Sequence, residues 1–524
     1  MIRPARAYRF RRILCALLLA CLFLSALSCT SGSKDSPASL ADSGTAGIGF
    51  PEGPIDNSAL IPPILPDAEV QLERTGRLST PDWFKSVIMV ELRIETATPE
   101  GTFAAAVPLL DRYAEMGVNC IWLTPIYEKG PGGNGYGNNG LHTVEPRLTG
   151  TDDYEAGWQV VKDFVDEAHA RNIRILLDIV TWGAMKGSPL VAEHPDFFKG
   201  EAWGNAAFDW KNEEFKAWFI GHAVNNILRT GADGYRCDCE PNYAGYAVFS
   251  EIREKLLDAG RKVVILAEDG NVRKNAFDAE MDGVLDYALC SRGDQYEAPH
   301  NFYLEDLDIV ESVKTGKGIG MDVLQGNGTG GQFRFYTFCV TNHDYQWRVV
   351  EGNRLVIGYQ AICAPFIPYW YMGDESGVTM FSRAVLYDIP VNAAATPDPD
   401  FYEDVKRMIR IRRTYADIFE YFPDDHRDSN ICAVETTGLT ALRAYARYMG
   451  DHAVLVIPNN EKDADGSFTA KIPYADMGLP AGQYTVTDLL TGNTVASGKS
   501  TELTSFSGSV PYEAMGVYLI EKNG

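Results

Sequence analysis

Short apolar runs alternate with amphipathic stretches along the middle of the chain, from about Trp83 to Tyr415. Short apolar runs predict buried strands, and apolar residues spaced three and four apart predict helices. We interpret eight runs as strands: Ser86–Glu91, Val118–Thr124, Ile173–Val180, Gly234–Asp238, Val263–Glu268, Gly283–Tyr287, Phe335–Val340 and Pro365–Met372. The clearest helical patterns cover Phe103–Met116, Asp152–Ala170, Asn212–Thr230 and Tyr243–Ala259. Repeated strand–helix units of this kind predict a parallel sheet.

Eight such units over about 330 residues are typical of a closed (β/α)8 TIM barrel with inserted loops. An open doubly wound sheet is the alternative, but no glycine-rich phosphate-binding loop follows the first strand. After Asp417 the apolar runs become shorter, alternate with polar residues and are separated by turns. That pattern predicts a small antiparallel β domain, with its clearest strands at Ala453–Ile457, Ala470–Ile472, Gln483–Val486 and Gly516–Ile520.

The N-terminus has the pattern of an export signal. Five arginines precede an apolar run from Ile13 to Leu27, which has about the length of a signal-peptide core and is short for a membrane span. The small residues Ala26 and Ser28 before Cys29 resemble a bacterial lipoprotein cleavage site, at which Cys29 would carry the lipid. Ordinary cleavage after Ser28 is the alternative. We therefore expect export, with a lipid anchor on a bacterial membrane or otherwise secretion.

These patterns predict a division of the chain into four parts. Residues 1–28 form the signal peptide, and residues 29–66 form a flexible tether rich in Ser, Gly, Ala and Pro. The barrel is expected over residues 67–416, with a short inserted loop region at 183–209. Residues 417–524 are expected to form the C-terminal β-sandwich.

Charge and cysteine content narrow the possible functions. The chain has 47 Lys and Arg residues against 71 Asp and Glu residues, a formal net charge of −24, so it repels phosphate backbones and we expect no nucleic-acid partner. Of ten cysteines, seven remain after removal of the signal peptide and lipidation of Cys29, and an odd number argues against a disulfide framework. Cys237 and Cys239 could be read as metal ligands, but no second Cys or His pair at zinc spacing accompanies them.

Polar residues follow the predicted strands at their C-terminal ends, where a barrel places its active site. Arg236 and Asp238 lie two residues apart in one strand, so both point to the same side. An arginine beside a carboxylate keeps it ionised, as a nucleophile requires. A structural ion pair is the alternative interpretation.

Two further strands end in groups that can carry chemistry. Glu268 directly follows the apolar run Val263–Ala267. A carboxyl group at the end of a buried apolar strand can have a raised pKa and act as a general acid. A solvent-exposed strand end is an equally good interpretation. His343 and Asp344 follow the seventh strand and could hydrogen-bond a polar ligand or cap a loop. Two carboxyl groups about 5–5.5 Å apart would support double-displacement glycoside hydrolysis with retention of configuration.

Together the motifs make the chain similar to glycoside hydrolase family 13, the α-amylase family, over roughly Trp83 to Gly524. The segments that carry the resemblance occur in the family's order: Gly117–Ile126, Gly135-Tyr136, Pro146-Arg147, Gly150-Thr151, Asp233–Asp238, Glu268, Asn342–Asp344 and Pro368–Glu375. The resemblance implies that Asp238 is the nucleophile, Glu268 the acid/base and Asp344 the third catalytic carboxylate. It also implies that His343 hydrogen-bonds the sugar, that Arg236 orients Asp238 and that Tyr136 stacks on the ring.

The chain departs from the family after the third strand. The family has Asn-His shortly after the Asp of that strand, whereas here Asp178 is followed by Ile179, Val180, Thr181 and Trp182. That Asn helps to bind a structural calcium in the family, so we expect no calcium site and no cofactor. Trp182 could replace the lost His by stacking on substrate, or it could pack under the loop. We expect Asp178 to be structural or to lie near the pocket without a direct chemical role.

The leading hypothesis is a retaining glycosidase acting on α-linked glucans or oligosaccharides. A transglycosylase on the same substrates differs only in whether water or a sugar hydroxyl accepts the glycosyl group. A non-catalytic glycan-binding lipoprotein is the alternative from another class: the altered third-strand motif favours it, and the matching carboxylates argue against it.

Overall fold

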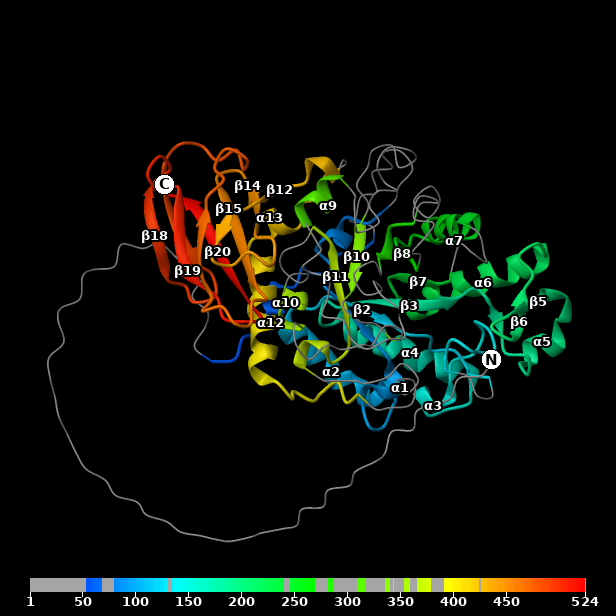
Figure 1. Cartoon of the computed structure of the whole chain (residues 1–524). Helices are drawn as coiled ribbons and strands as arrows, with labels where there is room; N and C mark the ends of the chain where they lie inside the picture. The colour runs from blue at the N-terminus through cyan, green and yellow to red at the C-terminus, as the bar shows by residue number, and fades with distance from the viewer. Residues whose placement is uncertain are drawn as a thin grey trace, which may run out of the picture. The chain divides into compact units, whose positions relative to one another are not determined.

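The computed structural model describes residues 53–67, 80–130, 134–239, 246–268, 281–286, 309–315, 335–339, 343, 353–358, 365–377, 391–423 and 426–523. Eight parallel strands close into one barrel, and each lies within, or one residue beyond, a predicted run (Figure 1). They are β1 (Met89–Leu92), β2 (Cys120–Leu123), β3 (Arg174–Val180), β7 (Gly234–Asp238), β8 (Val264–Ala267), β9 (Gly283–Asp286), β10 (Phe335–Cys339) and β11 (Ile367–Tyr371). Pairing of β1 with both β2 and β11 closes the ring, which confirms the barrel and excludes the open sheet.

The helices between the strands start and end at residues whose chemistry favours those positions. Helix α2 (Phe103–Met116) begins where the Thr102 side chain accepts a hydrogen bond from the Ala105 amide and ends at Gly117, whose φ is +99°. Asn212 caps α6 (Glu213–Thr230) in the same way, and Gly231 ends it. A side-chain acceptor at the N-cap satisfies amides that the helix leaves unpaired, and glycine adopts the left-handed conformation at the C-terminus at little cost.

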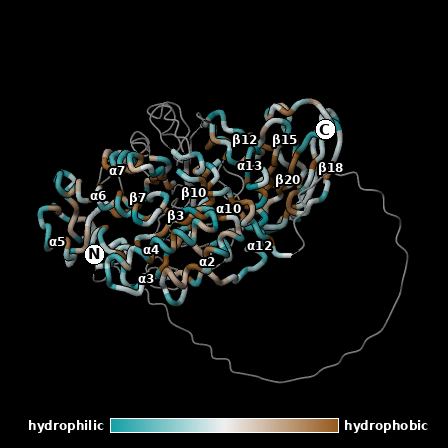
Figure 2. Tube along the Cα trace, turned by 180° about the vertical axis from the view of Figure 1, so that it is seen from behind, coloured by the Kyte–Doolittle hydropathy of each residue, from teal (hydrophilic) through white to brown (hydrophobic). Residues whose placement is uncertain are grey.

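The other helices in the described part of the chain are mostly short. In chain order they are α1 (Ile94–Ala97), α3 (Pro146–Thr149), α4 (Tyr154–His169), α5 (Pro189–Glu193), α7 (Tyr246–Asp258), α9 (Ile309–Thr315), α10 (Asn353–Gly358), α12 (Pro399–Thr414) and α13 (Ala416–Phe419). The four helices expected from periodicity correspond to α2, α4, α6 and α7. Apolar segments gather on the strands, and the helices expose hydrophilic segments (Figure 2).

Alternation along the barrel strands separates an inner from an outer set of side chains. Met89 belongs to the apolar cluster inside the barrel, whereas its neighbour Val90 packs in the cluster formed with the helices. In β7, Tyr235 and Cys237 belong to that outer cluster. Because strand side chains alternate with a period of two, Glu91 on β1 and the polar residues of β7 face the barrel interior.

The segment after β3, predicted to be a short inserted loop, contains a small antiparallel sheet. Its strands are β4 (Gly183–Ala184), β5 (Phe198–Ala202) and β6 (Asn205–Phe208), in the order β4-β6-β5. Gly183 has a φ of +158°, and a Cβ atom there would lie 2.0 Å from the carbonyl oxygen of Ala206. Glycine is therefore required where β4 approaches β6.

The C-terminal region is the expected antiparallel β domain. Strands β12 (Ile431–Ala433), β14 (Tyr445–Met449), β15 (His452–Asn459), β20 (Ala514–Lys522), β17 (Gln483–Asp488) and β18 (Thr494–Lys499) form one sheet. Strands β13 (Thr436–Thr437), β16 (Ser467–Lys471) and β19 (Ser505–Ser509) form another. Leu455 of the first sheet and Phe468 of the second share an apolar cluster, so the two sheets face each other. Val454 and Val456 belong instead to the barrel's outer cluster, which explains why β15 is buried on both faces.

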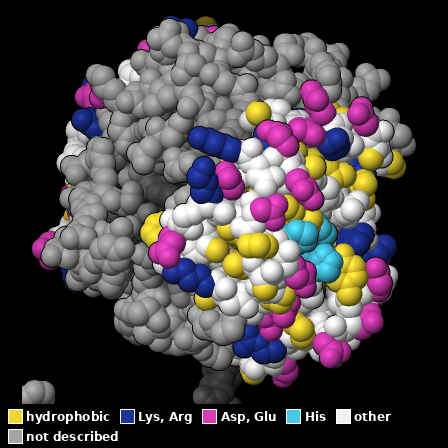
Figure 3. Space-filling view, turned by 90° about the vertical axis from the view of Figure 1, so that its right-hand side faces the viewer, with side chains coloured by type: hydrophobic (Ala, Val, Ile, Leu, Met, Phe, Trp, Pro, Cys, Tyr) yellow, Lys and Arg dark blue, Asp and Glu magenta, His cyan; other side chains and the backbone are white. Residues whose placement is uncertain are grey.

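Within the described residues, no helix combines the length and apolar character needed to cross a bilayer. Among the described residues on the face that Figure 3 presents, acidic and basic side chains are interspersed.

Candidate active site

Arg236 lies at the centre of the site and is fully buried. Its Nη1 atom lies 3.1 Å from Oδ1 of Asp238 and 3.1 Å from Oδ2 of Asp178, and its Nη2 atom lies 2.6 Å from Oε1 of Glu268. One guanidinium therefore bridges carboxylates from three adjacent strands, β3, β7 and β8. The planar fork of arginine suits this role, because its five donors hold fixed directions.

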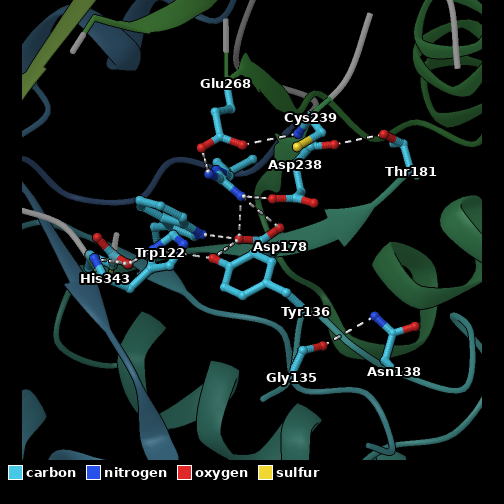
Figure 4. Close-up of polar contacts among 12 residues, drawn as sticks. Trp122, Gly135, Tyr136, Asn138, Asp178, Thr181, Asp238, Cys239, Glu268 and His343 are labelled. Atoms are coloured by element: carbon cyan, nitrogen blue, oxygen red, sulfur yellow. Dashed lines mark hydrogen bonds and ion pairs between the residues drawn. The ribbon is translucent and has the colours of Figure 1, made fainter. Parts of the chain in front are cut away.

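Asp238 and Glu268 lie on the same rim because parallel strands place their C-terminal residues side by side. Asp238 is the last residue of β7, and Glu268 follows β8 directly, with its backbone amide donating to the Cys237 carbonyl at 3.1 Å. Its Oε2 atom accepts a hydrogen bond from the Cys239 amide at 3.0 Å (Figure 4). These contacts hold Glu268 against the end of β7, beside Asp238.

The spacing of these carboxylates restricts the chemistry. Oxygens of Asp238 and Glu268 and the sulfur of Cys239 all lie within 4.8 Å of one another. Such a separation is close to the roughly 5–5.5 Å typical of retaining glycosidases and short of the roughly 6.5–9.5 Å that an inverting enzyme needs for a water. Among the described residues, this is also the one group of ligand atoms close enough together to hold a metal ion.

Asp178 contributes more to the site than the sequence predicted. It is buried, and its Oδ2 atom accepts hydrogen bonds from Nε1 of Trp122 and from the hydroxyl of Tyr136, each at 3.0 Å (Figure 4). Burial raises the pKa of Asp178 to about 6, against the opposing charges of Arg236 and His343. Asp178 therefore holds the aromatic wall of the site and shares Arg236 with Asp238.

His343 enters the same space from the segment after β10. Its ring stacks on Tyr136 with centroids 4.5 Å apart, and Nδ1 lies 3.3 Å from the Tyr136 hydroxyl. Nδ1 also lies 2.6 Å from Oε1 of Glu91, the inward-facing carboxylate of β1. Glu91 was not predicted as a site residue. Its position two residues after the apolar Met89 in the first strand could have indicated that it faces the barrel interior.

Trp182 and Thr181 occupy the positions where the motif departs from the family. Trp182 is 5% exposed and packs with Tyr136, Val180 and Ala202, which is the packing alternative. The Thr181 hydroxyl donates to the backbone carbonyl of Asp238 at 2.7 Å. Trp182 therefore offers no side-chain oxygen that could bind a calcium ion. The Thr181 hydroxyl is already engaged in a hydrogen bond to the end of β7.

Two predicted residues cannot be placed. Asp344, the expected third carboxylate, and Cys29, the expected lipidation residue, lie outside the described residues. Arg236, Asp238, Glu268, Tyr136 and His343 are brought together as described above.

Residues 37–183 match the sequence profile of the α-amylase catalytic domain. An α-amylase from Geobacillus thermoleovorans, complexed with acarbose, superposes with a TM-score of 0.65 and 18% identity, covering 84% of this chain and 99% of that chain. The resemblance to the α-amylase family is confirmed. A maltogenic α-amylase from Thermotoga neapolitana has the same α-amylase fold, with a TM-score of 0.62 and 17% identity over 84% of this chain and 99% of that one.

Relatives of α-amylase type also match by sequence over shorter stretches. A malto-oligosyltrehalose trehalohydrolase from Saccharolobus solfataricus is 26% identical over 364 residues, which cover 60% of each chain. A trehalose synthase/amylase from Mycobacterium tuberculosis is 30% identical over 120 residues, 22% of this chain and 19% of that relative. The match thus spans about a fifth of the latter protein's length.

Proposed function

We propose that the protein is a retaining glycosidase that hydrolyses α-linked glucans or oligosaccharides by double displacement. The observation that carries the proposal is the separation of at most 4.8 Å between oxygens of Asp238 and Glu268 on one barrel rim. Carboxylates this close leave no room for a water on the opposite side of the sugar ring, so one of them must itself attack the anomeric carbon. The names of the relatives, α-amylases and a malto-oligosyltrehalose trehalohydrolase among them, support an α-glucan as substrate.

Each carboxylate takes one role. Asp238, ion-paired to Arg236 at 3.1 Å, stays ionised and attacks the anomeric carbon to form a glycosyl-enzyme intermediate. The family resemblance assigns Glu268 the second role: it gives a proton to the leaving glycosidic oxygen and then takes one from the attacking water. Arg236, Tyr136 and His343 line the same space, and the family resemblance assigns Asp344 to the sugar hydroxyls.

The test is hydrolysis of a panel of α-1,4 and α-1,6 glucans, sucrose and trehalose, with the first anomer released followed by NMR. We expect the α-anomer to appear first, and Asp238→Asn or Glu268→Gln to lower kcat by at least about a thousandfold. Asp233→Asn is the matched control, because Asp233 is a buried carboxylate just before β7, at the opposite rim of the barrel. Release of the β-anomer would contradict the mechanism.

The same experiment separates the alternatives. A trehalose synthase/amylase and a 1,4-α-glucan branching enzyme are among the matched relatives, so a sugar acceptor is the second candidate. Longer products or new linkages from maltooligosaccharides would identify a transglycosylase. Binding of glucans without turnover by the wild type would identify a non-catalytic glycan-binding protein.

We also propose that the protein is exported and held on a bacterial membrane by lipid at Cys29. The proposal is supported by the arginines, the apolar run and the small residues before Cys29. Metabolic labelling with a fatty acid should mark the wild type and not Cys29→Ser. Labelling of both proteins, or of neither, would contradict the anchor.

A further inference from the structure

We propose that Glu91 is a positioning residue for His343, holding the imidazole in a fixed orientation with its proton on Nδ1. The effect on catalysis rests on the proposed function, whereas the contact between Glu91 and His343 is independent of it. Glu91 Oε1 lies 2.6 Å from Nδ1 of His343 and 3.3 Å from its backbone amide. Both the ring and the main chain of this residue are thereby held by one carboxylate.

The burial of Glu91 makes this contact important. Glu91 is 0% exposed and His343 is 2% exposed. Among the residues that the structure describes, no partner is recorded for the second oxygen, Oε2. A buried carboxylate is costly unless it is paired, so Glu91 depends on its contact with His343. An ionised carboxylate only accepts, and Nδ1 must therefore donate.

The neighbouring hydrogen bonds agree with a proton on Nδ1. The hydroxyl of Tyr136 has one proton, which it donates to Asp178 at 3.0 Å. At 3.3 Å from Nδ1, the hydroxyl oxygen can then act as a weak second acceptor for the imidazole proton. A carboxylate that orients an imidazole in this way fixes its tautomer and stabilises positive charge on the ring.

The charged groups around the His343 ring come from several strands. Glu91 faces it from β1, Asp178 acts on it from β3, and Arg236 lies beyond Tyr136 on β7. Arg236 also stacks over Trp122, which meets the His343 ring edge-on at 5.8 Å between centroids. Of these contacts, the one between Glu91 and Nδ1 is the shortest, at 2.6 Å, so Glu91 holds the proton on that nitrogen.

The direct test is the ¹⁵N NMR spectrum of the full chain labelled in its eight histidines, with His343→Asn used to assign the signal. Wild type should show a protonated Nδ1, and Glu91→Gln should shift the Nδ1 and Nε2 signals toward a tautomer mixture. An unprotonated Nδ1 in the wild type would overturn the proposal. This result does not depend on turnover, so it stands apart from the proposed function.

Kinetics test the consequence. We expect Glu91→Gln to lower kcat/KM by about 10- to 100-fold, comparable to removal of the partner of a metal-bound imidazole. Glu91→Asp, one methylene shorter, should recover part of the loss. Asp233→Asn removes another buried carboxylate paired with a histidine, His169 at 2.8 Å, and should leave kcat/KM within about threefold in folded protein. Full activity in Glu91→Gln, or equal losses in Glu91→Gln and Asp233→Asn, would overturn the catalytic role.

Discussion

Replacement of Asp178 by Asn should change how stability depends on pH. Burial raises the pKa of Asp178 from the ordinary 3.8 to about 6 in the folded protein, so the folded state binds a proton that the unfolded state releases. Stability from this group is complete below about pH 4 and is lost as the pH rises through about 6. Asn mimics the protonated carboxyl group and carries no such loss.

The two pKa values set the magnitude. Their difference corresponds to about 3 kcal/mol of unfolding free energy, of which about 2 kcal/mol develops between pH 4 and pH 7. Asp178→Asn should therefore gain about 2 kcal/mol relative to wild type over that interval. Arg236 keeps its contacts with Asp238 and Glu268 in the variant, so its charge stays paired.

Urea unfolding of both proteins, followed by tryptophan fluorescence at pH 4, 5, 6 and 7, measures this difference. Comparison at each pH removes the contributions of the other titrating groups. Asp233→Asn is the control with the opposite sign: although burial opposes them, His169 and Arg174 lower the pKa of Asp233, so its stabilising effect fades as the pH falls. A difference between wild type and Asp178→Asn that stays constant across the four pH values would refute the reasoning.

Three further predictions concern the backbone and metal dependence. Trp203 is 72% exposed and has a φ of +52°, a backbone conformation that asparagine adopts more readily than tryptophan. Trp203→Asn should therefore raise the unfolding free energy, measured by urea denaturation, by up to about 1 kcal/mol. An unchanged or lower unfolding free energy would contradict this. Gly234→Ala should lower the unfolding free energy by more than about 2 kcal/mol, because a Cβ atom there would lie 1.9 Å from the Val264 carbonyl oxygen. Gly221→Ala, on the open face of α6, is the control and should leave the unfolding free energy unchanged or raise it. Similar changes in both variants would contradict the reasoning. Dialysis against EDTA should leave the thermal midpoint and any glucan hydrolysis unchanged, because the Asn that helps to bind calcium in the family is missing after Asp178. Restoration of either property by added calcium would contradict this expectation.

Local sequence carries most of the information about the elements. The runs at Gly234–Asp238 and Phe103–Met116 correspond residue for residue to β7 and α2, because strand and helix periodicity and the capping residues act within a few positions. The convergence of Asp238 and Glu268 followed from the rule that parallel strands end on one rim. The small sheet in residues 183–208 was missed, since two of its strands have only four residues or fewer.

What the sequence by itself determined is which residues lie at the rim and which chemistry they can supply. Only the tertiary structure decided how they are paired: one arginine among three carboxylates, Asp178 beneath Tyr136, and Glu91 with His343, 252 residues apart in the chain. The physical reason is that periodicity reports a side chain's direction relative to its own strand. The partner that satisfies a buried charge depends instead on barrel closure, which brings distant strand ends together and excludes water from the space between them.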